Sequence, residues 1–288
     1  MSEEVHDAAR RGFGEAAAEY DAIRPDYPES AIDRMAQELE LGPGASVLDL
    51  GAGTGKLTRL LAATGAGLVA LEPVEGMWRT LVRMVPDVPV AAGVAEALPF
   101  AGASFDAAVA GQAFHWFRGE AALGEIARVL RPAGRMGLIW NNPDESVGWV
   151  GDLMRMLERY ERGTPRERTG EWRRAFSASD DFGTLHQRRF AHQQWLDREG
   201  FVARIASTSF VRTLPPGERE EVLGRLRDLA EEVAGPAGRI VLPYHTELYW
   251  CAGPERPRRL ATRPPNPPGA AEYAFLGIVR RSRSAIVC

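Results

Sequence analysis

The sequence predicts an α/β fold in which helices cover both faces of a doubly wound, mostly parallel sheet. Five short apolar runs alternate with stretches whose apolar residues have helical spacing; the runs are residues 47–50, 68–71, 90–92, 105–110 and 136–140. A glycine-rich turn joins the first run to the helical stretch that follows it. Strand, glycine turn and helix in this order form the first unit of a nucleotide-binding sheet.

This first unit reads VLDLGAGTGKLT from Val47 to Thr58. Its apolar start is typical of a buried parallel strand, and the leucines after the turn have helical spacing. Glycine permits a tight turn and lets a ligand lie against bare backbone. The free N–H groups at the start of the following helix point at that ligand. The turn is therefore the first candidate for a binding site.

Spacing distinguishes the cofactors that use such a turn. A P-loop needs glycine six residues before its lysine and Ser or Thr after it, but these positions hold Leu50 and Leu57. The dinucleotide fingerprint needs a third glycine at position 56, which is Lys56. The remaining pattern, D-x-G-x-G-x-G beginning at Asp49, resembles motif I of the class I S-adenosylmethionine-dependent methyltransferases.

Length, charge and composition exclude several other classes of protein. The 288 residues suit one large domain or one domain with insertions, and a net charge of −4 gives no electrostatic footprint for nucleic acid. Two cysteines and five scattered histidines form no disulfide framework and no metal cluster. No apolar run reaches the roughly 18 residues of a membrane span, and the polar N-terminus is not a secretory signal. We therefore expect a cytoplasmic protein without nucleic-acid or membrane partners.

The resemblance also implies an architecture. It implies a Rossmann-like sheet of seven mostly parallel strands with an antiparallel last strand, the later strands lying near residues 185–195 and 239–251. Residues 1–42 would form a helical cap, with Ser30 capping the helix at 31–41. Residues 43–253 would form the methyltransferase domain, with a helical lid insertion at about 195–235. Residues 254–288, rich in Pro and Arg, would form a tail.

The resemblance implies S-adenosylmethionine as the cofactor and a set of residues around it. Glu72 lies 21 positions after Gly51, close to the spacing at which an acid accepts hydrogen bonds from the two ribose hydroxyls. Met77 would pack on the adenosine. Val94 stands where the family often has the Asp of an Asp-Ala-Glu segment, which removes one acceptor for the adenine. The expected cofactor-binding residues are Asp49, Gly51, Ala52, Gly53, Gly55, Glu72, Pro73, Met77, Ala95, Glu96 and Gln112.

The acceptor side is expected where the fourth run ends in GQAFHWF, residues 111–117. The proline-aromatic tetrapeptide of the amino-methylating members is absent there. Gln112, His115 and Trp116 instead resemble the branch that includes trans-aconitate methyltransferase. His115 would act as a base or orient an acidic substrate, and Arg24 would clamp a carboxylate bidentately.

Two tyrosines join these catalytic candidates. In the family a leading helix folds over the cofactor mouth, so Tyr20 and Tyr27 would lie near the acceptor together with Trp116. The alternative for both tyrosines is a packing role.

The predicted function is methyl transfer from S-adenosylmethionine to a small-molecule acceptor, which is a carboxylate, a hydroxyl or an amine. Two alternatives stay open. One is an S-adenosylmethionine-binding protein that uses the same pocket for non-methylating chemistry or regulation. The other is a nicotinamide-dependent dehydrogenase on a similar sheet. Lys56 argues against it, because the dinucleotide fingerprint needs glycine at this position.

Overall fold

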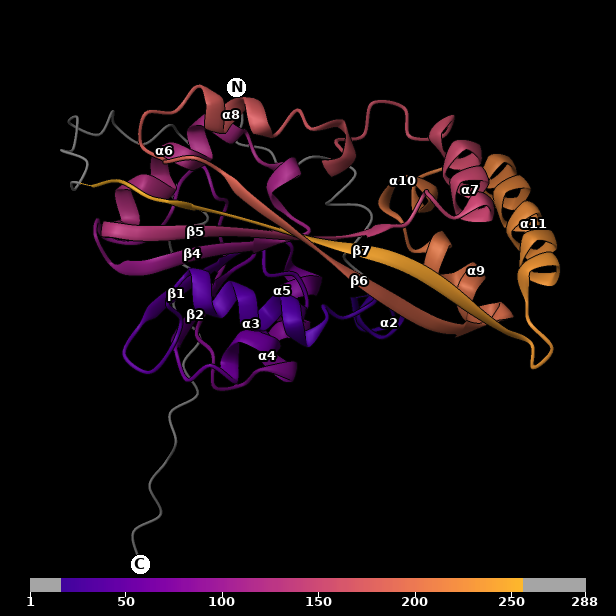
Figure 1. Ribbon diagram of the computed structural model, residues 1–288, viewed down its shortest axis with the longest axis horizontal. Coiled ribbons are helices and arrows are strands. Elements are labelled where there is room, and N and C mark those ends of the chain that lie inside the picture. Colours follow the sequence, from indigo (N-terminus) through magenta and orange to yellow (C-terminus); the bar gives the residue numbers. More distant parts are fainter. Residues whose placement is uncertain (1–16, 256–288) are drawn as a thin grey trace, which may run out of the picture.

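The computed structural model describes residues 17–255, and of residues 18–20 it describes the backbone alone. Its centre is a seven-stranded sheet with the order β3-β2-β1-β4-β5-β7-β6 (Figure 1). The first five strands in this order pair in parallel, and β7 runs antiparallel to both β5 and β6. The predicted mostly parallel, seven-stranded α/β sheet is confirmed.

The strands are β1 (Ser46–Leu50), β2 (Gly67–Leu71), β3 (Val90–Ala91), β4 (Phe105–Gly111), β5 (Leu130–Pro143), β6 (His186–Asp197) and β7 (Arg239–Ala252). The α-helices are α2 (Ala17–Ile23), α3 (Glu29–Glu38), α4 (Lys56–Ala62), α5 (Glu75–Met84), α6 (Gly119–Val129), α7 (Gly148–Glu158), α8 (Arg173–Ser177), α9 (Arg198–Ala206), α10 (Ser209–Arg212) and α11 (Pro216–Val233). Two 3₁₀ turns lie at Phe114–Trp116 and Glu167–Thr169.

The sheet has a separate apolar core on each face. Successive residues of a strand point to opposite faces, so Val47 joins the core under α3 and α4, whereas Leu48 joins the core under α6 and α8. Figure 1 shows these two helical layers on either side of the strands. Burial on both faces explains why the parallel strands read as continuous apolar runs in the sequence.

A third core lies at the far end of the long β6–β7 hairpin. There α7, α9, α10 and α11 pack on one another and on Ile240, Leu242 and Tyr244 of β7. Figure 1 places these four helices together at the right-hand end of the hairpin. Helices α9 to α11 come between β6 and β7 in the chain, as expected for the insertion at 195–235. We call α9, α10 and α11 the lid.

Two sequence expectations differ from the structure. Ser30 does not cap its helix, because α3 begins at Glu29 with Pro28 at the N-cap and without a side-chain cap. Strand β5 begins at Leu130 rather than at 136, because residues 131–135 form an irregular part of the strand with a shifted register. Strand β7, which contains Pro243, lies inside the sheet between β5 and β6.

Pro243 is tolerated inside the sheet because β5 ends beside it. The last β5–β7 pair is Pro143 with Tyr244, whereas β6 continues alongside. The Pro243 carbonyl faces β5 and accepts the N–H of Asp144. The N–H that proline lacks would face the same side, where β5 has ended and no ladder bond is lost.

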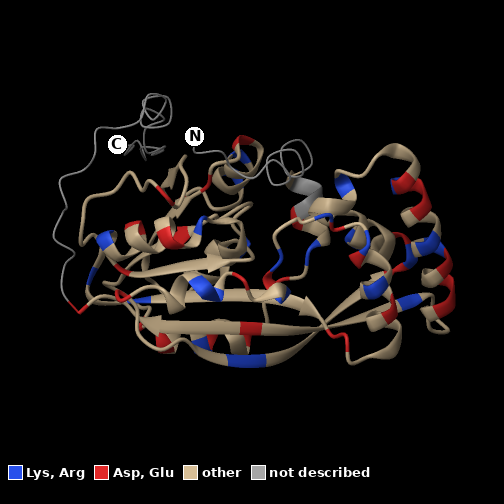
Figure 2. Ribbon diagram, turned by 90° about the horizontal axis from the view of Figure 1, so that it is seen from above, with Lys and Arg blue, Asp and Glu red and all other residues tan. Residues whose placement is uncertain are grey.

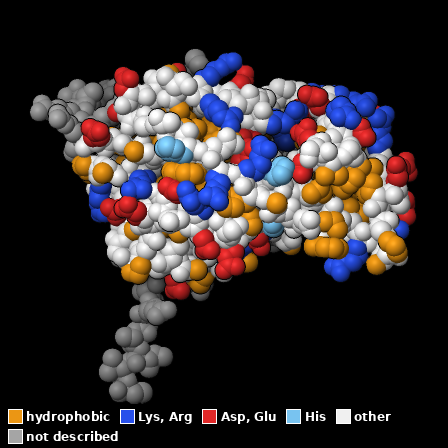
Figure 3. Space-filling model, in the orientation of Figure 1, with side chains coloured by type: hydrophobic (Ala, Val, Ile, Leu, Met, Phe, Trp, Pro, Cys, Tyr) orange, Lys and Arg blue, Asp and Glu red, His pale blue; other side chains and the backbone are white. Residues whose placement is uncertain are grey.

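Charges of both signs are interspersed over the sheet and over the lid (Figure 2). On the face shown in Figure 3, hydrophobic side chains gather over the helical end of the molecule, at the right of the view. No helix within residues 17–255 has the length and apolar character that crossing a membrane requires.

Candidate active site

The glycine turn after β1 holds backbone angles that favour glycine. Gly51, Gly53 and Gly55 have φ angles of +62°, +60° and +87°. A Cβ on Gly51 would lie 2.8 Å from the Cβ of Ala113, so this glycine permits close packing against the segment after β4. A Cβ on Gly53 would meet nothing within 4 Å. Gly53 thus presents bare backbone to a cavity.

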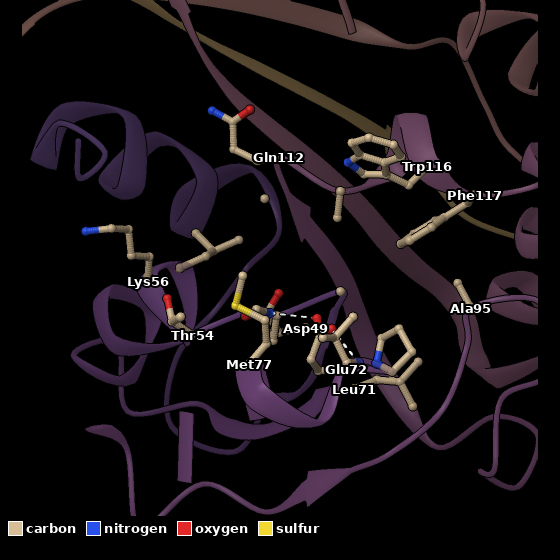
Figure 4. A pocket seen from close by; sticks show the side chains of 18 of the residues that line it. Asp49, Thr54, Lys56, Leu71, Glu72, Met77, Ala95, Gln112, Trp116 and Phe117 are labelled. Carbon is tan, nitrogen blue, oxygen red and sulfur yellow. Dashed lines mark hydrogen bonds between the residues drawn. The ribbon is translucent and has the colours of Figure 1, made fainter. Parts of the chain in front are cut away.

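Glu72, at the carboxyl end of β2, closes this turn. Its Oε2 accepts the N–H of Gly53 at 2.9 Å and its Oε1 accepts the N–H of Val74 at 2.8 Å (Figure 4). Burial raises the pKa of Glu72 to about 7, and the two backbone N–H groups counter that rise. A carboxylate has about four acceptor positions, so two are left for the hydroxyls of a bound ligand.

Asp49 lies in the floor of the same cavity and is completely buried. Its Oδ2 accepts the hydroxyl of Thr58 at 2.6 Å, whereas its Oδ1 has no hydrogen-bond partner within the described residues. Burial raises the pKa of Asp49 to about 7, the Thr58 hydroxyl opposes the rise, and the charge of Glu72 adds to it. A buried acceptor without a donor is costly, so Oδ1 is poised for a donor on a ligand.

The cofactor cavity that these groups form has a volume of about 290 Å³. Figure 4 shows Met77 and Glu72 facing Trp116 and Phe117 across it, with Ala95 beside Phe117. Glu96 lines the cavity while its Oε1 accepts the N–H of Arg118 at 2.7 Å. The sequence-predicted residues on this wall are Asp49, Gly51, Ala52, Gly53, Glu72, Pro73, Met77, Ala95, Glu96 and Gln112. Gly55 does not line the cavity; its backbone packs under Leu81 of α5.

A second cavity of about 610 Å³ opens beside the first, and we call it the acceptor chamber. Five residues line both cavities, and we call them the junction: Arg24, Gln112, Trp116, Asn141 and Arg204. They come from the segment before α3, the end of β4, β5 and the lid helix α9. The junction is the place where a group on a cofactor could meet a group on a second ligand.

Two amide side chains hold the junction together. Gln112 directly follows β4 with a φ of +56°, and its Nε2 donates to the Asn141 carbonyl at 3.2 Å. Asn141 Nδ2 donates to the carbonyl of Asp26 at 3.0 Å, and its Oδ1 accepts the Thr246 hydroxyl at 2.6 Å. Asn141 therefore ties β5 and β7 to the segment that covers the cofactor cavity.

His115 lines the acceptor chamber and not the cofactor cavity. The Nε1–H of Trp140 donates to His115 Nδ1 at 3.1 Å. Loss of solvent lowers the pKa of His115 to about 3, and the charge of Arg166 adds to the shift. The ring is thus neutral with its proton on Nε2, so at neutral pH it is a hydrogen-bond donor rather than an effective base.

The segment before α3 contributes the remaining expected residues. Arg24 Nη2 donates to the carbonyl of Ser207 at 2.9 Å, which links this segment to the lid. Tyr27 lines the cofactor cavity and lies near Gly111, where a Cβ would be 2.8 Å from its hydroxyl. Tyr20 lies in α2, and its side chain is outside the described part of the structure.

Sequence analysis missed two residues of the junction, Asn141 and Arg204. The end of the fifth apolar run at Asn141 was an available signal, since ligands bind at the carboxyl ends of such strands. Arg204 carries no local signal, because only the folding of the lid brings it to a strand end far away in the chain.

Comparisons with known proteins agree with this geometry. Residues 48–138 match the family model described as a methyltransferase domain. An uncharacterized methyltransferase of Mycobacterium tuberculosis is 36% identical over 239 residues, which cover 81% of this chain and 92% of the relative. The chain belongs to the class I S-adenosylmethionine-dependent methyltransferases.

A second relative supports this membership, and a solved structure shares the fold. An uncharacterized methyltransferase-like protein of Schizosaccharomyces pombe is 34% identical over 222 residues, covering 77% of this chain and 86% of the relative. A solved structure of a proposed type II methyltransferase from Anaeromyxobacter dehalogenans superposes with a TM-score of 0.61 at 24% identity, covering 82% of this chain and 99% of that one. The latter shows the fold alone.

The residues of this methyltransferase fit S-adenosylmethionine. Glu72 offers acceptors for two ribose hydroxyls, and the unpartnered Asp49 Oδ1 offers an acceptor for a donor of the ligand. The open space at Gly53 leaves room for the ligand against the backbone. The family therefore implies this cofactor, and the cavity has the matching groups.

Proposed function

We propose that this methyltransferase methylates a small-molecule acid at a carboxylate oxygen, with the acid lying in the acceptor chamber and its carboxylate at the junction. The observation that carries the proposal is the junction itself, where five residues line both cavities. S-adenosylmethionine bound in the cofactor cavity supplies an electrophilic methyl group on a sulfonium. The chain must then hold the acceptor oxygen in line with that methyl group.

The chemistry of the junction favours a carboxylate over a phenol or an amine. Its side chains are two guanidinium groups, two amides and an indole, none of which accepts a proton at neutral pH. His115 is nearby in the chamber, but its pKa of about 3 makes it a poor base. A carboxylate is already ionised and needs no base. The Arg24 guanidinium would hold it through charge-assisted hydrogen bonds.

Positioning is then the main contribution of the protein. Alignment of two bound reactants can lower a barrier by several kcal/mol, up to about 7–11 in ideal cases. The hydrogen bonds of Asn141 to Asp26 and Thr246 keep the junction rigid. Arg204 of helix α9 lines the junction, and closure of the lid over bound ligands would exclude water from it. The resemblance of Gln112, His115 and Trp116 to the branch that includes trans-aconitate methyltransferase is consistent with an acidic acceptor.

The test uses the full chain with methyl-labelled S-adenosylmethionine and panels of small carboxylic acids, phenols and amines. We expect labelled methyl esters that are released by mild base, and no label when Gly53→Val replaces the wild-type chain. Transfer only to amines or phenols would overturn the choice of acceptor. Cofactor binding without methyl transfer to any compound of the panels would instead favour the alternative, a protein that uses the cofactor pocket for non-methylating chemistry.

A further inference from the structure

Arg204 is a buried cation without a counter-charge. It lies in the last turn of α9 and is only 5% exposed. Its Nε has no hydrogen-bond partner, and it forms no ion pair with any residue of the described range 17–255. Its guanidinium carbon lies 5.6 Å from the ring centroid of Tyr244, which is a weaker partner than a carboxylate.

Such an arrangement is costly for the protein alone. An arginine side chain does not lose its proton in proteins, so burial cannot neutralise it. A buried charge without a partner destabilises the folded state, whereas an apolar side chain at the same place does not. The charge of the neighbouring Arg166 makes the position still more positive. An anion that arrives with a ligand would supply the missing partner.

Three other arginines of the chamber lie close to acids. Arg189 lies 2.5 Å from Glu247, and Arg168 lies 2.7 Å from Glu161. Arg166 lies 3.5 Å from Glu161. Arg173 also lines the chamber, but its Nη2 donates to the Tyr249 hydroxyl at 2.5 Å and it does not line the cofactor cavity, whereas Arg204 lines both cavities at the junction.

We infer that Arg204 binds a second oxyanion of the acceptor, one that is not methylated. This inference rests on the proposed function and narrows its substrate class to acids with a further carboxylate or phosphate group. The division of labour has a chemical reason. A strong ion pair lowers the nucleophilicity of a carboxylate, and the buried Arg204 would form a stronger pair than the half-buried Arg24, so Arg204 is better suited to a group that does not react. Arg204 belongs to helix α9, which lies with the other lid helices at one end of the molecule (Figure 1).

The test measures binding by calorimetry in the presence of saturating S-adenosylhomocysteine. The probes are dicarboxylates of three to six carbons, their monoamides, and phosphoglycolate. We expect the best dicarboxylate or phosphoglycolate to bind the wild-type chain at least tenfold more tightly than the monoamide, and the comparison between them identifies the group. In Arg204→Met this preference should fall to less than twofold. In Arg198→Met, the same change on the same helix but outside both cavities, it should persist.

Thermal unfolding separates a ligand-binding role from a structural one. Without ligand, Arg204→Met should keep or raise the unfolding midpoint, because an apolar side chain replaces an unpaired charge. Arg204→Gln, which removes the charge but keeps a polar side chain, should lose the same binding preference. A lower midpoint together with an unchanged preference overturns the inference, as does a wild-type chain that binds no diacid or binds the monoamides equally well. If S-adenosylhomocysteine itself fails to bind the wild-type chain, the proposed function fails instead.

Discussion

The backbone N–H of Gly53 donates to the carboxylate of Glu72 at 2.9 Å, so one side chain both shapes the glycine turn and faces the cofactor cavity. This bond joins the carboxyl ends of two neighbouring parallel strands, β1 and β2. Because the second oxygen holds the N–H of Val74, Glu72 organises the backbone on both sides of the ligand.

Glu72→Ala should weaken binding of S-adenosylmethionine and of its thioether product. Loss of a charged acceptor should cost about 1.5–3 kcal/mol in binding free energy. The glycine turn would also lose the hydrogen bond from Gly53 to Glu72, which should weaken binding further. Calorimetry on the folded variant measures it. Glu75→Ala is the matched control, since Glu75 is an exposed acid of α5 outside both cavities. Equal affinity of the Glu72 variant and the wild type would remove Glu72 from the site.

Cofactor affinity should rise with pH through about 7, where Glu72 and Asp49 ionise. Stability of the ligand-free chain should show the opposite trend. Burial raises both pKa values in the folded state, so between about pH 4 and 7 the folded chain keeps protons that the unfolded chain releases, and stability falls as pH rises. Calorimetry and thermal unfolding from pH 5 to 8 measure the two trends. Parallel trends would contradict the assignment.

Gly53→Val should abolish cofactor binding while the sheet stays folded. The new side chain would fill the space that the cofactor needs, and the positive φ would cost about 1–2 kcal/mol in stability. Gly163→Val is a matched control for the strain alone, because Gly163 also has a positive φ and open space around its Cβ. Circular dichroism and binding are measured on both. Normal binding by a native-like Gly53 variant would refute the prediction.

Arg24→Ala should raise the acceptor KM at least tenfold and leave cofactor affinity nearly intact. It should also lower stability slightly, because the hydrogen bond to the Ser207 carbonyl is lost. Arg79→Ala, an exposed arginine paired with Glu75, provides the control. The measurements are KM, cofactor Kd and unfolding midpoint on the same preparations. A lower unfolding midpoint together with an unchanged acceptor KM would show that Arg24 has a packing role.

His115→Ala should lower stability and not remove a titrating base from the reaction. The Trp140 N–H would lose its acceptor, at a cost of about 1–3 kcal/mol. The loss should be smaller in a Trp140→Phe background, where the donor is already absent. The pH profile of turnover should keep its shape in His115→Ala. A loss of about 10²–10⁴ in kcat, with a vanished pH dependence, would restore His115 as the general base.

The sequence by itself determined the sheet and the residues at the carboxyl ends of its strands that face the cofactor cavity. Strand and helix periods are local properties, and the glycines of residues 51–55 together with Glu72 follow strands whose carboxyl ends must share one edge. The expected strand at 185–195, the strand at 239–251 and the helices between them also occur, at β6, β7 and the lid.

Only the tertiary structure decided the acceptor side. The sequence shows that His115 follows a strand, but not that Trp140 occupies its Nδ1 or that burial lowers its pKa. It also gives no sign that Arg204, on a helix of the lid, reaches the ends of β4 and β5. Local pattern determines where elements begin and end, whereas long-range packing determines which side chains meet, lose water and lack a partner.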